Sequence, residues 1–419
     1  MEVNRCLSTK LANLWRHHAV VKILSAPPKP DTRKMLLPIG PVIVFGASNF
    51  PFAFSTAGGD AASALAAGCT VVIKGHSAHS KTSLLVYEAM LEAVQQSNMP
   101  EHTVQHLLGA GNSIGKELVL HPFSAAVGFT GSYSGGKALT EYASKREIPV
   151  PVFAEMSSIN PVIFLPDTIA ENGDLLAQQF VASLNLGAGQ FCTNPGLVIV
   201  MECDGLNNFI SKITTAISTA IPQKMLHNGI HQSYNAGLEN MLKQKGIQLL
   251  AQSLQPPLEM EGRPSFARVT ASAFLGNPAL HEEVFGPYSL MIVCNNKEEM
   301  IAVLHSLKGQ LTGTIMGTIE DFETHSDIIE IQTSLAGRVI LNGAPTGVEV
   351  CASMVHGGPF PATTDGRFTS VGTGAIKRWV RPVCFQNFSD SLLPDALKSN
   401  NPLGIWRLVN NQFSKDVIL

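Results

Sequence analysis

This sequence lacks a long apolar run, a secretory signal and closely spaced cysteines. No stretch of about 18 consecutive apolar residues occurs, so we predict no membrane-spanning helix. Residues 1–18 carry charges and histidines where a secretory signal requires an apolar core, which favours a cytoplasmic protein. The seven cysteines are scattered without a CxxC motif, which indicates free thiols in a reducing compartment. His76 and His79 have no third ligand at a suitable spacing, so we predict no bound metal.

An excess of one charge is also missing. The chain has 29 basic and 32 acidic side chains, a formal net charge of -3, with no basic block and no acidic tail. Phosphate backbones and anionic membranes attract clustered positive charge, so we expect neither nucleic acid nor a membrane as partner. With 45% hydrophobic residues in 419, the composition is typical of a globular protein of two or three domains. The expected ligand is a small molecule.

From Pro41 to Glu155, short apolar runs alternate with helical stretches. The runs are continuous and rich in Val and Ile, as is typical of buried parallel strands joined by crossover helices. We therefore predict a doubly wound α/β domain, with helices at Ala57–Ala67, Ser80–Gln96, Ser113–Leu120 and Gly135–Lys145. The residues before Pro41 look irregular and include a proline-rich stretch at 26–30, so we predict an arm or linker there.

After Glu155 the alternation continues with a different spacing, which predicts a second α/β domain. Its strands are expected at Leu197–Met201, Tyr288–Cys294 and Arg338–Asn342. The segment Ser370–Phe385 mixes glycines with β-branched and aromatic residues, which predicts a further strand. From Pro394 onward, Pro, Asn and charged residues favour a surface tail.

Cys192 lies in a glycine-rich segment, GAGQFCTNPG, at 187–196. Glycines ahead of a cysteine permit a tight backbone path and the close approach of a substrate. Most cysteines are small buried hydrophobic residues, and this alternative describes the cysteines that lie in apolar runs. At Cys192 the setting favours an accessible thiol, which becomes a nucleophile if backbone dipoles lower its pKa.

Two further polar residues follow apolar strands. Glu155 ends the run at 149–155. A purely structural role for an acid at a strand end is there as good an interpretation as a catalytic one. At the edge of a doubly wound sheet, however, a carboxylate faces the ligand crevice and suits general-base catalysis. Asn49 follows the first strand. Its amide either stabilises a turn or donates an N–H hydrogen bond to an oxyanion. The segment HEEVFGP at 281–287 is by itself only a loop signal.

Taken in chain order, four segments resemble the NAD(P)-dependent aldehyde dehydrogenase superfamily: GASNFP at 46–51, FTGS at 129–132, GQFCTNPG at 189–196 and EEVFGP at 282–287. The resemblance runs from about Pro38 to the C-terminus. It implies a Rossmann-type NAD(P)-binding domain, an α/β catalytic domain and an oligomerisation strand. AEMSSINPV at 154–162 and LNGAPTGVEV at 341–350 are similar to the 2,5-dioxovalerate (α-ketoglutarate semialdehyde) dehydrogenase branch.

The resemblance divides the chain into four parts: an N-terminal arm or linker at 1–37, an NAD(P)-binding domain at 38–155, a catalytic domain at 156–371, and the oligomerisation strand with a C-terminal tail at 372–419. Family members have roughly a hundred more residues ahead of the GASNFP segment, so the cofactor domain is expected to be incomplete at its N-terminus. This raises an alternative function: a catalytically poor remnant that acts as a subunit or binding partner. The resemblance also implies a homo-oligomer, either a dimer or a tetramer.

The resemblance further implies the reaction. Cys192 attacks the aldehyde carbon as a thiolate, while the Asn49 side chain and the Cys192 backbone N–H bind the oxyanion. After hydride transfer, Glu155 activates the water that hydrolyses the thioester. The implied reaction converts 2,5-dioxovalerate to 2-oxoglutarate. The alternatives are a wider range of aliphatic aldehydes and an acylating enzyme that transfers the acyl group to coenzyme A, against which Glu155 argues. Arg338 and Arg367 are candidates for a substrate carboxylate or for structural ion pairs.

The implied cofactor is NADP or NAD. The residues assigned to it are Lys74 and Ser77 at the adenosine ribose, Gly131 and Ser132 at the pyrophosphate, and Glu283 with Phe285 at the nicotinamide ribose. The chain after Lys74 reads Gly75-His76-Ser77 and lacks the acid that would repel a 2'-phosphate. NADP is therefore slightly favoured.

Overall fold

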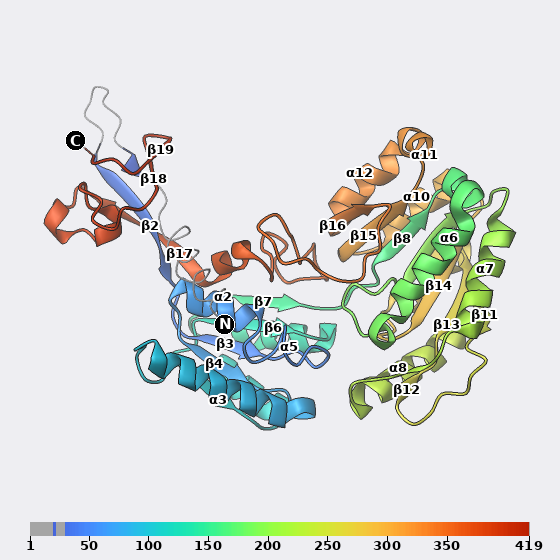
Figure 1. Ribbon diagram of the computed structural model, residues 1–419, viewed down its shortest axis with the longest axis horizontal. Helices are drawn as coiled ribbons and strands as arrows, with labels where there is room; N and C mark the ends of the chain where they lie inside the picture. Colours follow the sequence, from blue (N-terminus) through green and yellow to red (C-terminus); the bar gives the residue numbers. More distant parts are fainter. Residues whose placement is uncertain (1–19, 22–29, 419) are drawn as a thin grey trace. The chain divides into compact units, whose positions relative to one another are not determined.

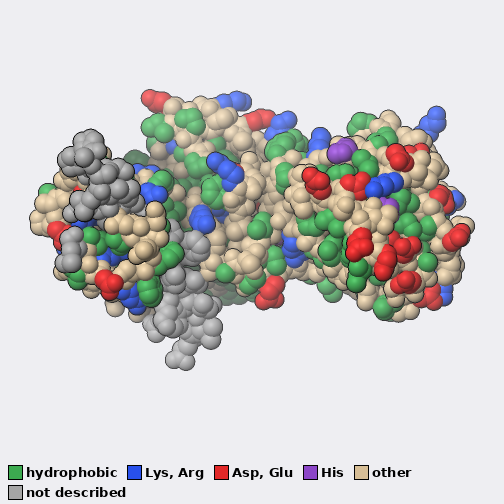
Figure 2. All heavy atoms as spheres, turned by 90° about the horizontal axis from the view of Figure 1, so that it is seen from above, with side chains coloured by type: hydrophobic (Ala, Val, Ile, Leu, Met, Phe, Trp, Pro, Cys, Tyr) green, Lys and Arg blue, Asp and Glu red, His purple; other side chains and the backbone are tan. Residues whose placement is uncertain are grey.

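The computed structural model describes residues 20–21 and 30–418, which form two compact units (Figure 1). Of the described residues, unit 1 comprises 20–21, 30–129, 138–153 and 371–418, and unit 2 comprises 130–137 and 154–370. Within the described residues, no helix has the length and apolar character needed to cross a membrane. Figure 2 shows acidic and basic side chains interspersed over the face that it draws, in keeping with the nearly balanced charge.

One sheet of unit 1 has five strands, in the order β5 (Val104–Leu107), β4 (Val71–Lys74), β3 (Val42–Phe45), β6 (Ala126–Thr130) and β7 (Val152–Glu155). The first four pair in parallel. The connecting helices are α2 (Gly59–Ala67), η1 (Ser77–His79), α3 (Ser80–Gln96), α4 (Gly111–Leu120) and α5 (Tyr133–Ser144). The chain adds strands first on one side of β3 and then on the other, so the switch point between β3 and β6 is where such sheets bind ligands. The GASNFP and FTGS segments continue from these two strands.

A second sheet of unit 1 joins the two ends of the described chain. Its order is β17 (Val380–Gln386), β2 (Thr32–Pro38), β1 (Val20–Val21), β18 (Arg407–Val409) and β19 (Gln412–Ser414), next to the short helices η4 (Thr373–Trp379), η5 (Asp390–Leu392) and η6 (Asp395–Leu397). β2 pairs antiparallel with β17 along its whole length. The expectations of irregular structure before Pro41 and of a plain surface tail after Pro394 were therefore wrong for these strands. Their partners are distant in the sequence, so local patterns do not show them.

Unit 2 is built on a seven-stranded sheet. Its order is β11 (Gln248–Gln252), β13 (Ser265–Thr270), β14 (Tyr288–Cys294), β9 (Leu197–Met201), β8 (Pro161–Phe164), β15 (Gln310–Met316) and β16 (Ala336–Leu341). β11 pairs antiparallel with β13, and all the other pairs are parallel. β10 (Gln223–Lys224) and β12 (Glu261–Gly262) form a separate small ribbon.

Helices cover both faces of the seven-stranded sheet (Figure 1). They are α6 (Pro166–Asn185), η2 (Leu186–Gly189), α7 (Leu206–Thr219), α8 (Asn228–Leu242), α9 (Ala271–Leu275), η3 (Pro278–His281), α10 (Lys297–Ser306), α11 (Ile319–Thr324) and α12 (Ser326–Leu335). Along β8, Val162 and Phe164 pack in one core with α6 and α7, whereas Ile163 packs in the other core with α8, α10 and α12. Because successive side chains of a strand point to opposite faces, a continuous apolar run serves both cores.

The predicted α/β architecture is confirmed. The helix at Ser80–Gln96 and the strands at Leu197–Met201 and Tyr288–Cys294 have the predicted bounds, and the predicted strand within Ser370–Phe385 is found as β17. β8 and β15 were not predicted. β15, QLTGTIM, contains Gln, Gly and two Thr residues, yet it is fully buried, because neighbouring strands on both sides satisfy its backbone.

Candidate active site

Cys192 lies in a tight turn that connects η2 to β9. Gly187, Ala188 and Gly189 have φ values of 58, 57 and 65°, in the left-handed region where glycine is least strained. At Gly189 a Cβ atom would lie 2.3 Å from the backbone carbon of Gly286, so no side chain fits there. The glycines therefore allow the GQFCTNPG segment to pack directly against the EEVFGP segment.

The buried amide of Asn160 holds the backbone of this turn. Its Nδ2 donates to the carbonyl oxygens of Cys192 at 2.8 Å and of Asn194 at 3.0 Å. Its Oδ1 accepts from the hydroxyls of Ser158 at 2.8 Å and Thr312 at 3.0 Å. A buried polar network whose members are all paired is rigid. The thiol is therefore fixed in position from the backbone side.

Glu155 ends β7, and its side chain is only 4% exposed. Ser370 Oγ donates to Glu155 Oε2 at 2.9 Å, while Glu155 Oε1 lies 2.9 Å from His356 Nε2. The Glu155 backbone forms an isolated bridge with Thr363, and its carbonyl accepts from the Gly131 N–H at 3.0 Å. Segments distant in the sequence thus fix both the backbone and the carboxylate.

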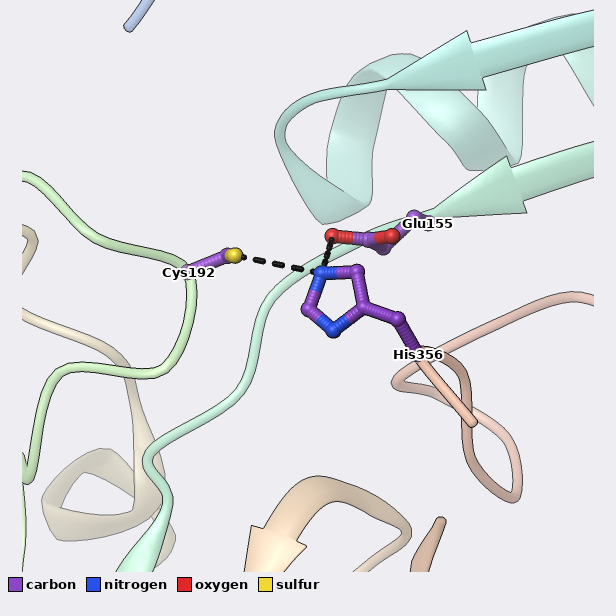
Figure 3. A group of neighbouring side chains, drawn as sticks. All are labelled: Glu155, Cys192 and His356. Atoms are coloured by element: carbon purple, nitrogen blue, oxygen red, sulfur yellow. Dashed lines mark hydrogen bonds and ion pairs between the residues drawn. The ribbon is translucent and has the colours of Figure 1, made fainter. Parts of the chain in front are cut away.

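His356 lies between the thiol and the carboxylate (Figure 3). Its Nε2 is 3.3 Å from Cys192 Sγ and 2.9 Å from Glu155 Oε1, and its ring is 1% exposed. The backbone N–H of His356 donates to Thr369 Oγ1 at 2.9 Å, and the backbone carbonyl of His356 accepts from the backbone N–H of Ser370 at 2.8 Å. One ring nitrogen therefore faces both partners, so a proton on Nε2 is placed between the sulfur and the carboxylate.

The charges of these three groups depend on one another. Burial alone would lower the pKa of His356, but the Glu155 carboxylate and the Cys192 thiolate outweigh it and hold that pKa well above its usual value. Burial raises the pKa of the Cys192 thiol; His356 opposes this rise, whereas Glu155 and Glu283 add to it. The imidazolium of His356 is therefore the group that stabilises a thiolate at Cys192.

This arrangement suits covalent catalysis at a carbonyl carbon. It places a thiol nucleophile, an adjoining cation and a buried carboxylate within hydrogen-bond reach of one another. The positive charge beside the sulfur favours the attacking thiolate, and the carboxylate is available to accept a proton from water.

Comparisons with known proteins decide the family. The model of the aldehyde dehydrogenase family matches residues 9–359. The chain belongs to the aldehyde dehydrogenase family. It is 47% identical to an alpha-ketoglutaric semialdehyde dehydrogenase of Acinetobacter baylyi, over 93% of this chain and 74% of the relative. It is also 47% identical to an alpha-ketoglutaric semialdehyde dehydrogenase 2 of Azospirillum brasilense, over 91% of this chain and 73% of the relative.

Solved structures show the same fold. The chain is similar to the glyceraldehyde-3-phosphate dehydrogenase GapN of Methanocaldococcus jannaschii, solved in complex with NADP, with a TM-score of 0.75 and 20% identity. The similarity covers 92% of this chain and 79% of that one. The family match begins at residue 9, whereas the motifs recognised in the sequence reach back only to Pro38.

Within unit 2 of this aldehyde dehydrogenase, four of the predicted cofactor residues lie near one another: Gly131, Ser132, Glu283 and Phe285. The Glu283 carboxylate accepts hydrogen bonds from the Ser157 side chain and the Ser158 backbone. Ser157 Oγ also accepts from the backbone N–H of Tyr133, in the loop that contains Gly131 and Ser132. Phe285 follows on the Glu283 loop and helps to line a pocket with it. These donors and acceptors suit ribose hydroxyls and phosphate oxygens, so this part of unit 2 fits a dinucleotide.

Lys74, Ser77 and Asn49 belong to unit 1. Lys74 ends β4 and is 5% exposed; burial lowers its pKa, and no acidic side chain in the described part of the chain pairs with it. The buried ammonium group of Lys74 has N–H donors available, so it suits the hydroxyl oxygens of a ribose. Ser77 is exposed at the start of η1, and Asn49 lies in the loop after β3. The oxyanion role of Asn49 and the ribose roles of Lys74 and Ser77 stay predictions.

Glu283 predicts a pH dependence of cofactor binding. Burial raises its pKa to about 7, despite the hydrogen bonds from Ser157 and Ser158. The ionised carboxylate is a better hydrogen-bond acceptor for a ribose hydroxyl than the protonated acid. At pH 6 Glu283 would be ionised in roughly a tenth of the molecules, so the cofactor KM is expected to rise about tenfold from pH 8 to pH 6. Initial rates across this range measure the effect.

Glu283→Gln is expected to flatten this profile, whereas the exposed neighbour Glu282 offers a matched Glu282→Gln control that keeps it. The same shift predicts a stability effect: an acid with a raised folded-state pKa makes the chain less stable as pH rises from about 4.5 to about 7. A cofactor KM that is the same at pH 6 and pH 8 in the unaltered chain would contradict the assigned role of Glu283.

Three residues of the site were not identified from the sequence: His356, Ser370 and Asn160. His356 lies outside the predicted strands, in a glycine- and proline-rich region, and Ser370 is the first residue of a segment predicted as a strand; neither belongs to a motif of known spacing. Asn160 lies within the AEMSSINPV segment, directly before Pro161, and an asparagine before a proline is common in turns. The tertiary contacts, not any sequence signal, reveal their roles.

Proposed function

We propose that this chain oxidises 2,5-dioxovalerate (α-ketoglutaric semialdehyde) to 2-oxoglutarate with NADP or NAD. The observation that carries the proposal is the cluster of Cys192, His356 and Glu155, in which Cys192 lies on the cysteine loop of an aldehyde dehydrogenase. Two relatives named as alpha-ketoglutaric semialdehyde dehydrogenases, each 47% identical to the chain, support the choice of substrate.

The first step forms a covalent bond between Cys192 and the substrate. The thiolate attacks the aldehyde carbon, and the carbonyl π electrons move to the oxygen as an oxyanion. His356, with Nε2 at 3.3 Å from the sulfur, stabilises the thiolate before attack. The Cys192 backbone N–H and the Asn49 amide are the proposed oxyanion donors. The nicotinamide cofactor, when bound, supplies the hydride acceptor, and loss of the hydride leaves a thioester on Cys192.

The second step hydrolyses this thioester. Once Cys192 is acylated, its negative charge is gone, and one of the two groups that raise the pKa of His356 is lost. The imidazolium then loses its proton to solvent more readily. This leaves the Glu155 carboxylate ionised and without its charged partner, so that it can accept a proton from the hydrolytic water. The hydroxide formed attacks the thioester carbon, the C–S bond breaks, and the acid leaves.

NADP is the cofactor that we favour slightly over NAD. The support is the Gly75-His76-Ser77 segment after Lys74, which lacks an acid that would repel a 2'-phosphate. A cytoplasmic location and assembly into a dimer or tetramer also belong to this proposal.

Neither arginine that we considered for the substrate carboxylate is an obvious choice. Arg338 donates to the carbonyl oxygens of Pro345 and Gly347, and the exposed Arg367 pairs with Asp365 at 2.6 Å. Both therefore have structural partners.

The test is formation of reduced cofactor by the purified 419-residue chain with 2,5-dioxovalerate and either NADP or NAD. We expect turnover with this substrate and a higher kcat/KM than with unbranched aliphatic aldehydes of similar length. Turnover that is not increased by coenzyme A would argue against an acylating enzyme.

Two outcomes would contradict the proposal. Equal kcat/KM values for all the aldehydes would favour the broader aliphatic alternative. No turnover from a chain that is folded by circular dichroism would favour the catalytically poor remnant.

A further inference from the structure

The catalytic cluster also has the composition of a metal-binding site. We propose that Cys192 Sγ, His356 Nε2 and Glu155 Oε1 bind one zinc ion, which blocks the nucleophile reversibly. The donor atoms of these three residues all lie within 4.8 Å of one another. They come from the η2–β9 turn, from the end of β7 and from the loop after β16, so only the fold brings them together (Figure 3).

The distances between the donors suit a small tetrahedral ion. Zinc binds sulfur at about 2.3 Å and nitrogen or oxygen at about 2.0–2.2 Å, so tetrahedral ligands lie about 3.3–3.6 Å apart. Sγ and Nε2 are 3.3 Å apart, and Nε2 and Oε1 are 2.9 Å apart. Sγ and Oε1 lie within 4.8 Å, so the carboxylate has to move slightly away from His356 and by up to about 1 Å toward the sulfur for zinc to replace the proton between these groups.

The donor types and their charges favour zinc over other divalent ions. Thiolate and imidazole ligands favour zinc over magnesium or calcium, which prefer oxygen. One thiolate, one neutral imidazole and one carboxylate together neutralise the two positive charges. A neutral complex avoids the cost of leaving a net charge in a site where His356 and Glu155 are 1% and 4% exposed.

The surroundings hold the ligands in place. Ser370 Oγ donates to Glu155 Oε2 and leaves Oε1 toward His356. Asn160 Nδ2 holds the Cys192 carbonyl, and Thr369 Oγ1 accepts from the His356 backbone N–H. Such outer contacts orient metal ligands and reduce the entropy lost on binding.

Cys192 is the accessible ligand, since it is partly exposed whereas His356 and Glu155 are buried. A zinc ion therefore approaches from the side that the aldehyde uses, and its fourth position is left for water. Zinc and aldehyde should compete for the sulfur, and a chelator should restore activity. Metal binding does not depend on the proposed substrate, but the loss of turnover rests on the proposed function.

The prediction of no metal from the sequence rested on ligand spacing, and positions 155, 192 and 356 are too far apart for any spacing rule. Surface thiols are the main competitors for a thiophilic ion. Cys351 and Cys384 are exposed, and hydrogen bonds with Ser353 lower the pKa of Cys351. The experiment therefore uses a chain with Cys351→Ser and Cys384→Ser.

Cobalt(II) is the probe, because its absorption spectrum reports both thiolate coordination and tetrahedral geometry, and zinc is then added to displace it. We expect one cobalt per chain with a thiolate-to-cobalt charge-transfer band, displacement by zinc, and loss of the band in Cys192→Ala. His356→Asn and Glu155→Gln are each expected to weaken binding by at least about tenfold. The exposed His305 provides the matched control, His305→Asn, which should bind as the parent does.

Thermal unfolding checks that every variant is folded, and Glu155→Gln, which preserves side-chain size, tests the site even if His356→Asn does not fold. A charge-transfer band and affinity unchanged in both variants would overturn the proposal, because the thiolate alone would then hold the metal. Absence of the band in the parent would overturn it as well. Turnover measured in chelator, without metal, tests the proposed function separately.

Discussion

Replacing Cys192 with Ala is expected to lower kcat by about 10⁶-fold, to the level of the uncatalysed background. A variant without its nucleophile loses the covalent pathway as a whole, and single deletions of this kind in other covalent enzymes have effects of about this size. Neither His356 nor Glu155 can substitute for the sulfur, because neither forms the thioester. Reduced-cofactor absorbance with 2,5-dioxovalerate measures the loss.

Cys351→Ala is the matched control, since Cys351 is an exposed thiol of the same unit. It should leave turnover unchanged. A Cys192→Ala variant that keeps more than about a hundredth of the parent kcat would contradict the assignment of the nucleophile. Titration with an alkylating reagent should also show one reactive thiol fewer in Cys192→Ala, because Cys192 is partly exposed.

Replacing Glu155 with Gln is expected to leave a burst of one reduced cofactor per active site and to lower the steady-state rate by about 10²–10⁴-fold. This range is typical for loss of a general base. Glutamine keeps the size of the side chain and its contact with Ser370, but it cannot take a proton from water. The thioester therefore forms and accumulates. Rapid mixing separates the burst from the later rate, and mass spectrometry detects the acylated chain.

An exposed acid of unit 2, Glu171, provides the matched Glu171→Gln control, which should show no change. An unchanged steady-state rate in Glu155→Gln would contradict the assignment of the base. Loss of both the burst and the steady-state rate would place Glu155 before thioester formation. In that case its role would be to hold His356 in the charged form beside the thiolate.

Much of the fold was predictable because strands buried on both faces have a continuous apolar pattern. Val42–Phe45 and Val71–Lys74 illustrate this, since each is a short Val- and Ile-rich run followed by a helix. The strand at Thr32–Pro38 was not predicted, because it pairs with Val380–Gln386 near the opposite end of the chain. β-strand pairing at such separation leaves no local periodicity that distinguishes an arm from a strand.

The candidate site was partly predictable for a similar reason. Cys192 and Glu155 lie in segments whose local chemistry is unusual: a thiol among glycines and an acid at the end of an apolar run. The residues that tune them have ordinary local surroundings. His356 is one of 13 histidines, and nothing in its neighbours indicates that its Nε2 lies 3.3 Å from a cysteine sulfur.

The amino-acid sequence alone was enough to identify the α/β fold and the family, and to predict Cys192 as the nucleophile and Glu155 as the base, because these depend on local patterns and on short motifs. The pKa values of the cluster depend instead on which charges lie within a few ångströms in a buried site, where electrostatic interactions are strong. Folding brings residues 155, 192 and 356 into that range. The charge state of the thiol, and its capacity to bind a metal, therefore follow from tertiary contacts that no spacing along the chain encodes.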